Sequence, residues 1–435
     1  MALEILILFG LFMILLFAGV PVAYALGIPS MFYFFFMQAG NTPIEFMPHT
    51  MTSPLFNFVL IALPAFLLSG RMMNSAGVTT RLYDLAIAFV GRFRGGLAYA
   101  NVVASIIFAS MSGTAVGDAG GLGQVQMKMM TQAGYRKAFS AGISSSSSVL
   151  GAMIPPSVAM VILGATAEIS IGRLFLAGIV PGFLMALALM VNIFIRAHTT
   201  PEGKAWPVEK VPLKRIPLDM KRAFLPMMTP VIIVGGIIFG LVTPTEAAVL
   251  AICYSIILGI FYRELTVKIF INTIADTAVT AGVFMFMIAV AGFFTWIITQ
   301  MGLPMLVAGA LAPLAEFSPS LVMLILALIL LFFGLFLDTT AAILLLTPTL
   351  MPVVHQAGLD PVHFGVVMVT ALITGIVTPP FGICLFVMAD VAELPVKDVT
   401  KESVRYLPAM FIALLIIIFG RDLILFIPNL LMGSS

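Results

Sequence analysis

The chain has 435 residues, of which 61% are apolar and only 9% charged, and its net charge is +2. Soluble domains carry roughly 25% charged residues, so a water-soluble enzyme is excluded, and the balanced charge argues against a nucleic-acid partner. The apolar runs are long and unbroken, unlike the alternating segments of a membrane β-barrel. The sequence therefore predicts an all-α polytopic membrane protein, with the lipid bilayer as its surroundings.

The first half of the chain contains a series of apolar segments, each near the roughly 20 residues that a membrane-spanning helix needs. Continuous spans are expected near 3–19, 21–38, 54–70 and 174–195, with a less apolar stretch at 80–94. Two other segments are interrupted: 96–130 by polar residues between Ser112 and Asp118, and 138–166 by Pro155-Pro156. We predict a re-entrant hairpin at 96–130 and a broken helix at 138–166.

The second half repeats this pattern. Val20-Pro-Val-Ala-Tyr-Ala-Leu26 matches Thr243-Pro-Thr-Glu-Ala-Ala-Val249, and Gly151-Ala-Met-Ile-Pro-Pro-Ser157 matches Gly375-Ile-Val-Thr-Pro-Pro-Phe381, in nearly the same register. The corresponding hairpin and broken helix are expected at about 320–353 and 364–388. We therefore predict a first repeat at 1–195, a basic connecting loop at 196–224 and a second repeat at 225–431.

The basic residues orient the two repeats, because Lys and Arg favour the cytoplasmic side of short loops. Those flanking the first hairpin are Arg71, Arg81, Arg92, Arg94, Lys128, Arg136 and Lys137, whereas no Lys or Arg occurs from 269 to 396. The two hairpins are therefore expected to enter from opposite sides. This predicts inverted repeats of about five crossings and one hairpin each, with both termini outside and the connecting loop inside.

Ionisable side chains at membrane depth are costly, and they are candidates for a functional role. Asp118 and Asp338 lie beside the two hairpin tips, where the alternative to a functional role is helix capping. Glu246 follows Pro244-Thr245, and we expect it to stabilise a helix start.

The proline pairs interrupt helices at equivalent places in the two repeats. A proline has no amide for the carbonyl four residues earlier, and broken backbone is tolerated in a membrane only beside a cavity or under protein. A packed kink is the alternative explanation for each pair. The carbonyls expected to lack helical partners are those of Gly151, Ala152, Gly375 and Ile376.

Carbonyls, hydroxyls and a carboxylate together form the oxygen cage that a small hard cation needs, and the N-terminal ends of broken helices suit an anionic substrate. The first predicted cation site comprises Ser112, Thr114, Asp118, Gly151, Ala152 and Ile154. The second comprises Asp338, Thr339, Thr340, Gly375, Ile376 and Thr378. Substrate contacts are expected at Ser110, Ser147, Pro155, Pro156, Pro379 and Pro380, and no cofactor is expected.

Two other functions remain open from the residues alone. An intramembrane hydrolase would use Asp118 and Asp338 as a catalytic pair and would need no ion gradient. An ion channel would conduct without substrate, although hairpins entering from two sides favour alternating access. The sequence has neither a His-Glu-x-x-His motif nor a phosphate-binding loop.

Several motifs resemble a known family over essentially the whole chain. They are Ala62-Leu-Pro-Ala-Phe-Leu-Leu-Ser-Gly70, Ser110-Met-Ser-Gly-Thr-Ala115 followed by Asp118, Gly151-Ala-Met-Ile-Pro-Pro-Ser157 and Thr374-Gly-Ile-Val-Thr-Pro-Pro-Phe381. The sequence resembles the large membrane (M) subunit of tripartite ATP-independent periplasmic (TRAP) transporters.

The resemblance implies a sodium-coupled importer in a bacterial inner membrane, with an elevator-type fold and sodium in both cation sites. It implies two protein partners, a small membrane subunit and a periplasmic substrate-binding protein. The implied substrates are organic anions such as C4-dicarboxylates, sialic acid and related sugar or keto acids.

The predicted topology can be tested with a single cysteine at Lys210, in a background lacking Cys253 and Cys384. A cytoplasmic connecting loop should protect this cysteine from an impermeant thiol reagent in intact cells and expose it after lysis. Labelling in intact cells would reverse the assignment of sides.

Overall fold

The computed structural model describes residues 2–37, 42–208, 212 and 214–433. Helices dominate these residues, and no strand occurs among them, which confirms the predicted all-α class. Lys210, the labelling position proposed above, lies outside the described residues.

The first half contains twelve α-helices in the described ranges. They are α1 (Ala2–Phe17), α2 (Val22–Phe32), α3 (Phe46–Thr52), α4 (Ala62–Ser75), α5 (Val78–Val90), α6 (Gly96–Ser112), α7 (Ala115–Gly120), α8 (Leu122–Gln132), α9 (Lys137–Ser148), α10 (Leu150–Met153), α11 (Val158–Ala167) and α12 (Ile171–Thr199). A π-helix at Tyr33–Met37 extends α2, and 3-10 helices at Ser53–Phe56 and Phe58–Ile61 lead into α4.

The second half continues in the same manner. Its helices are α13 (Pro201–Lys204), α14 (Arg215–Ile238), α15 (Pro244–Phe261), α16 (Val267–Gln300), α17 (Leu303–Phe317), α18 (Pro319–Gly334), α19 (Thr339–Gln356), α20 (Pro361–Gly375), α21 (Ile383–Ala392), α22 (Val396–Ser403), α23 (Leu407–Phe419) and α24 (Arg421–Met432).

Length and composition identify the helices that can cross a membrane. Within the described residues four helices qualify alone, α12, α14, α15 and α16, and up to seven spans result if each bent pair counts as one. Shorter apolar helices of 10–17 residues, among them α1, α6, α18 and α20, cover other expected crossings and hairpin arms. The arrangement of five crossings and one hairpin in each half stays a prediction.

The two interrupted regions fold as breaks within helical segments. The segment predicted as the first hairpin consists of α6, a turn at Gly113 and Thr114, and the pair α7 and α8. Gly113 ends α6 with a φ of +65°, a conformation that favours glycine, and the Thr114 side chain accepts from the Gly117 amide to begin α7. In the second half, Asp338 caps the N-terminus of α19.

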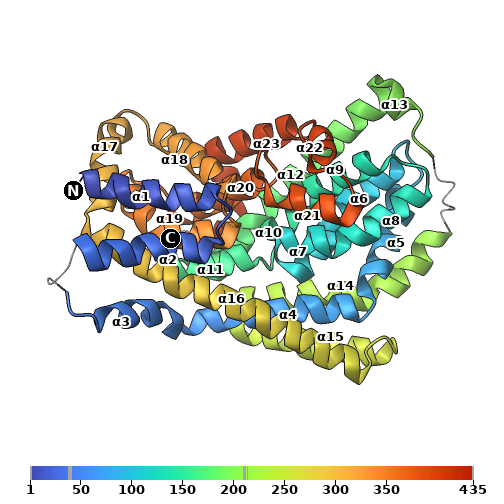
Figure 1. Ribbon diagram of the computed structural model, residues 1–435. Coiled ribbons are helices and arrows are strands. Elements are labelled where there is room, and N and C mark those ends of the chain that lie inside the picture. The colour runs from blue at the N-terminus through green and yellow to red at the C-terminus, as the bar shows by residue number, and fades with distance from the viewer. Residues whose placement is uncertain (1, 38–41, 209–211, 213, 434–435) are drawn as a thin grey trace.

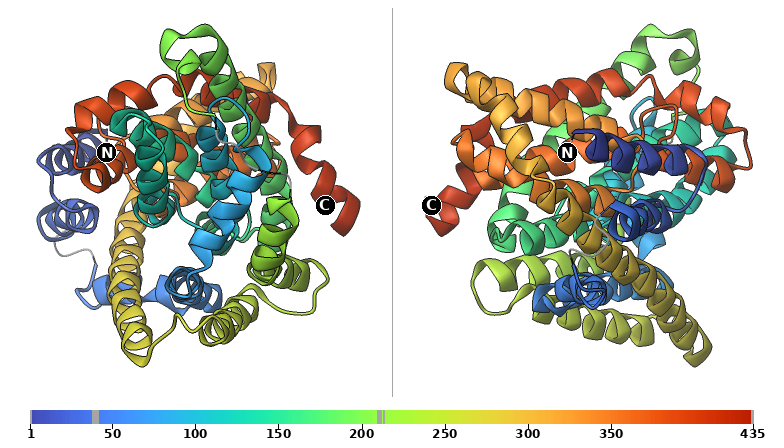
Figure 2. Two further views of the ribbon diagram at one scale, coloured as in Figure 1. Left: turned by 90° about the vertical axis from the view of Figure 1, so that its right-hand side faces the viewer. Right: turned by 60° about the vertical axis from the view of Figure 1, so that its left-hand side comes forward.

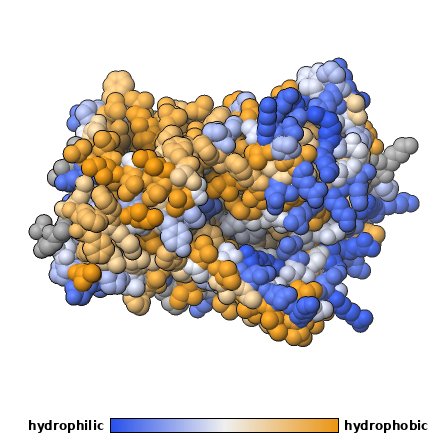
Figure 3. Space-filling view, in the orientation of Figure 1, coloured by the Kyte–Doolittle hydropathy of each residue, from blue (hydrophilic) through white to orange (hydrophobic). Residues whose placement is uncertain are grey.

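The helices form two sides around the broken segments (Figures 1 and 2). Helices α3, α4, α15 and α16 lie along one side, and α20 to α23 lie along the other. The α6–α8 segment lies toward one end of the molecule, whereas α18 and α19 lie toward the opposite end. Hydrophilic side chains gather at the end with α5, α8 and α13, and apolar side chains cover much of the remaining visible face (Figure 3).

The connecting loop is shorter than predicted. Helix α12 continues to Thr199 and α14 begins at Arg215, so both ends of the predicted 196–224 loop are helical. Two of the basic residues at these ends have acidic partners: Arg196 Nη2 lies 3.0 Å from Glu402 Oε2, and Arg215 Nε lies 2.8 Å from Asp219 Oδ2. The basic composition of 196–224 predicted a loop in water. Arg196 and Arg215 lie instead in helices, where Glu402 and Asp219 pair with them.

Glu246 has the structural role expected from the sequence. It forms a capping box at the start of α15, in which the Thr243 amide donates to Glu246 Oε2 at 2.7 Å and the Glu246 amide donates to Thr243 Oγ1 at 3.3 Å. Two otherwise unpaired helix-end amides are thus satisfied.

Helices α18 and α20 approach closely at two glycines. A Cβ on Gly334 would lie 2.7 Å from the Leu372 carbonyl oxygen, which is backbone and cannot rotate away. We predict that Gly334→Ala lowers the thermal stability of the detergent-solubilised protein, with a cost of about 1–3 kcal/mol from overpacking.

Gly282→Ala is the matched control, since a Cβ on this α16 glycine would meet nothing within 4 Å. Its melting temperature should equal or slightly exceed that of the original protein. Equal melting temperatures for the two variants would contradict the close packing of α18 against α20.

Candidate functional site

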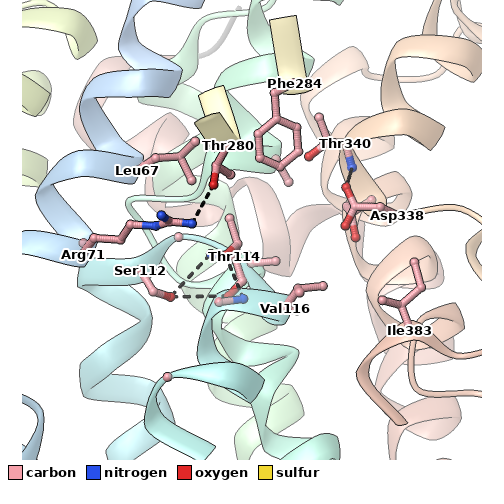
Figure 4. Close-up of a pocket in the computed structure, with 18 of the residues that line it drawn as sticks. Leu67, Arg71, Ser112, Thr114, Val116, Thr280, Phe284, Asp338, Thr340 and Ile383 are labelled. Carbon is pink, nitrogen blue, oxygen red and sulfur yellow. Dashed lines mark hydrogen bonds between the residues drawn. The ribbon is translucent and has the colours of Figure 1, made fainter. Parts of the chain in front are cut away.

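The tips of both hairpin regions meet at one cavity of about 510 Å³. Helices α4 and α16 form its opposite wall (Figure 4). Its polar lining residues are Arg71, Asn74, Ser112, Thr114, Thr280, Asp338, Thr339 and Thr340. Six of the predicted cation-site residues therefore reach a shared space, namely Ser112, Thr114, Ala152, Asp338, Thr339 and Thr340.

The first hairpin tip is fixed by its own polar groups and by the first helix break. The Ser112 hydroxyl donates to Asp118 Oδ1, which ties the end of α6 to α7. The Val158 amide donates to the Gly113 carbonyl at 3.0 Å, so the turn is bonded directly to the residues that follow Pro155-Pro156. The first hairpin tip and the first helix break therefore lie in direct contact.

Asp118 is the most unusual group of the site. Its side chain is only 1% exposed, and Oδ2 has no hydrogen-bond partner among the described residues. Gly151 faces this oxygen so closely that a Cβ at position 151 would overlap the carboxyl group. A buried carboxylate with one unsatisfied oxygen requires a proton or a cation, because an isolated buried charge is strongly unfavourable.

The first helix break is partly satisfied. The Ser157 hydroxyl donates to the Ala152 carbonyl at 2.5 Å, so this oxygen has a side-chain partner in place of the missing helical amide. Ile154 leaves α10 in an extended conformation, and its amide still donates to Leu150 at 3.0 Å. A carbonyl oxygen has two lone pairs, and the Ala152 oxygen retains one for a ligand.

The second hairpin tip presents three polar residues to the cavity. One oxygen of Asp338 accepts from the Thr340 amide at 2.9 Å, which is the capping role weighed as an alternative. The Thr339 hydroxyl is buried and has no partner in the described part of the chain. Capping and ligand binding are compatible here, because a carboxylate can accept several bonds.

The prediction of free carbonyls at the second break is wrong. The Gly375 carbonyl accepts from the Thr378 amide at 2.8 Å, and the Ile376 carbonyl accepts from the Cys384 amide at 3.1 Å. The chain closes a tight turn there, which supplies new amides where proline removes the helical ones. Gly375, Ile376 and Thr378 do not line the cavity.

Of the predicted substrate residues, the five whose side chains are described do not line this cavity. Ser147 lies in a buried network in which its hydroxyl donates to Asn101 Oδ1 at 2.7 Å. The four prolines Pro155, Pro156, Pro379 and Pro380 form the breaks, and both pairs have cis peptide bonds. The side chain of Ser110 lies outside the described residues.

The wall opposite the hairpins contains residues that were not predicted from the sequence. Arg71 extends from α4 into the cavity, and its Nη2 donates to the Thr280 hydroxyl of α16 at 2.7 Å (Figure 4). Phe284 lies one turn further along α16 and also lines the space. From the sequence, Arg71 was counted among the basic residues that flank the first hairpin. It directly follows the Ala62–Gly70 motif, and that position was the available signal for a role in the site.

A solved structure shares the fold of this chain. The chain superposes with a TM-score of 0.63 on the YdaH transporter of Alcanivorax borkumensis, at 14% identity, over 87% of this chain and 90% of that one. This likeness concerns the fold alone. Residues 9–423 match the family described as tripartite ATP-independent periplasmic transporter, DctM component, and the chain belongs to this family.

Curated relatives agree with this assignment. The chain is 39% identical to the sialic acid TRAP transporter large permease protein SiaM of Vibrio cholerae, over 96% of this chain and 97% of the relative. It is 34% identical to the 2,3-diketo-L-gulonate TRAP transporter large permease protein YiaN of Escherichia coli, over 94% and 95% respectively.

Membership of a transporter family overturns the hydrolase alternative. The protein is a transporter component rather than an enzyme. The geometry also gives no catalytic dyad, because Asp118 bonds to Ser112 and Asp338 bonds to Thr340, and no hydrogen bond joins the two carboxyls in the described ranges.

The cavity can be tested by thiol accessibility in a background without Cys253 and Cys384. Val116 lines the cavity, whereas Val149 is fully buried beside α10. We expect Val116→Cys to react with a small water-soluble thiol reagent in the purified protein and Val149→Cys to remain unreactive. Similar rates would contradict the placement of the cavity.

Proposed function

We propose that this chain is the sodium-coupled translocation subunit of an organic-acid importer. The observation that carries the proposal is the buried carboxylate of Asp118, of which Oδ2 has no hydrogen-bond partner among the described residues. It lies next to Ser112, in a hairpin tip that lines the shared cavity. In a membrane such a carboxylate needs a compensating positive charge, and a coupling cation supplies it.

Sodium suits the groups around Asp118. The Ser112 hydroxyl, the Ala152 carbonyl and the carboxylate itself are all oxygen ligands, which hard cations prefer. Asp338, Thr339 and Thr340 offer a second carboxylate and two hydroxyls across the cavity. We therefore propose two sodium sites. Most of their oxygen ligands would come from side chains, and the backbone carbonyls of the second helix break would contribute fewer ligands than the sequence suggested.

The proposed transport cycle is an elevator movement. Helix α4 packs against α15 and α16. Helices α4 and α16 form the wall that faces the hairpin tips. The contact between the two groups includes Gly70 of α4, where a Cβ would lie 2.6 Å from the Met111 carbonyl oxygen. Movement of the hairpin segments along this wall would carry the cavity toward either side of the membrane.

The family name implies a tripartite system. We propose that a small membrane subunit and a periplasmic substrate-binding protein complete the transporter, in a bacterial inner membrane. The names of the two relatives above specify sialic acid and 2,3-diketo-L-gulonate, which supports an organic acid as the substrate of this chain.

We predict that Asp118→Asn in proteoliposomes containing all three components raises the sodium concentration for half-maximal acid uptake by roughly tenfold or more. The amide keeps the shape of the side chain but removes the charge that binds the cation. Asp338→Asn should act in the same direction.

Asp390→Asn is the control, because Asp390 is exposed on α21. Its sodium dependence should match the original protein at equal reconstitution. An unchanged sodium curve for Asp118→Asn, or uptake driven equally well by a proton gradient without sodium, would refute sodium binding at this carboxylate.

A second expectation concerns the partners. The chain reconstituted alone should show little uptake, and addition of both partners should restore it. Full-rate uptake by the chain alone would show that the other two components are unnecessary for transport.

A further inference from the structure

We infer that Arg71 binds the carboxylate of a hydroxylated monocarboxylic acid at the α4–α16 wall of the cavity. The inference rests on the proposed import function and adds to it the anchoring residue and the substrate class. The two tests below are chosen so that they do not depend on sodium-coupled uptake.

Arg71 is the only basic residue among the described residues that line the cavity. Its side chain extends from α4 toward the hairpin tips, and Thr280 of α16 holds one edge of the guanidinium group at 2.7 Å (Figure 4). None of the ion pairs between described residues includes Arg71.

Arg71 is bonded to a neutral hydroxyl, whereas other arginines of the chain that are at least partly buried have carboxylate partners. Arg196 lies 3.0 Å from Glu402, and Arg215 lies 3.0 Å from Asp84. A guanidinium group has five N–H donors in a planar fork. Within the described residues, Arg71 makes one side-chain hydrogen bond, to the Thr280 hydroxyl. A second edge of the fork remains for a bidentate carboxylate.

Charge balance favours a substrate with one carboxylate. Asp118 and Asp338 each contribute a negative charge at the hairpin tips, and in the proposed function a sodium ion compensates each of them. The positive charge of Arg71 then remains uncompensated, and a single substrate carboxylate neutralises it. A second carboxylate would meet no further basic side chain on the described lining.

The remaining polar groups suit hydroxyls on the substrate. Asn74 supplies an amide, and Ser112, Thr114 and Thr280 supply hydroxyls, all of which donate and accept hydrogen bonds. A volume of about 510 Å³ lies within the usual range for small-molecule sites. The lining therefore fits a polyhydroxylated acid better than a short dicarboxylate.

The charge of Arg71 can be measured with thiol reagents on Val116→Cys, in the background without Cys253 and Cys384. In saturating sodium we compare the rates of an anionic and a cationic methanethiosulfonate of similar size. Arg71→Gln should lower the anionic-to-cationic rate ratio by about tenfold, because the local field for anions is lost. Arg71→Lys should largely preserve the ratio, and Arg94→Gln, at an exposed position, should leave it unchanged.

The substrate class is tested by protection of the same cysteine. Sialic acid should slow the reaction at millimolar concentration, whereas its uncharged methyl ester and succinate should protect much less. Protection by sialic acid should weaken at least about tenfold in Arg71→Gln and partly return in Arg71→Lys, which keeps the charge but not the bidentate fork.

An unchanged rate ratio in Arg71→Gln would overturn the role of Arg71. Protection by succinate as strong as that by sialic acid, or no protection by either acid, would overturn the substrate class. If the proposed sodium coupling is wrong, the anionic-to-cationic rate ratio can still be measured, because that measurement needs neither the partner subunits nor uptake. The two proposals can therefore fail separately.

Discussion

The arrangement of the site depends on how the protein accommodates the buried carboxyl group of Asp118. One oxygen accepts from Ser112, and the other lies against Gly151 without a partner in the described residues. The helix break, the glycine and the hairpin turn all meet at this carboxyl group. A larger residue at position 151 would overlap it, and Ala152, beside the helix break, lines the cavity.

The two walls of the cavity differ in chemistry. The hairpin tips carry acidic and hydroxyl groups, whereas α4 contributes the cationic group Arg71, held by Thr280 of α16. In the proposed cycle the cations travel with the hairpins and the substrate anion lies between the walls. Such a division would make tight substrate binding depend on the position of the hairpins, which alternating access requires.

The hairpin turn and the helix breaks were predictable from the sequence, because the features that define them are local. Polar residues inside an apolar block indicated the hairpin tip at Ser112, and consecutive prolines indicated the helix breaks. The wrong predictions concern hydrogen-bond and ion-pair partners, which the local sequence pattern does not specify. The carbonyls of Gly375 and Ile376 find amides within a tight turn, and Arg196 is neutralised by Glu402, which is 206 positions away. Arg71 was missed because it was counted only among the basic residues that flank the first hairpin, whereas the fold brings it to Thr280 in the cavity wall.

Binding of radioactive sodium to the purified chain is the most direct test of the central claim, since it needs neither substrate nor partners. The account predicts saturable binding that unlabelled sodium displaces and potassium does not, with a clear loss of affinity in Asp118→Asn and none in Asp390→Asn. Equal sodium binding by the original protein and Asp118→Asn, with both correctly folded, would contradict it.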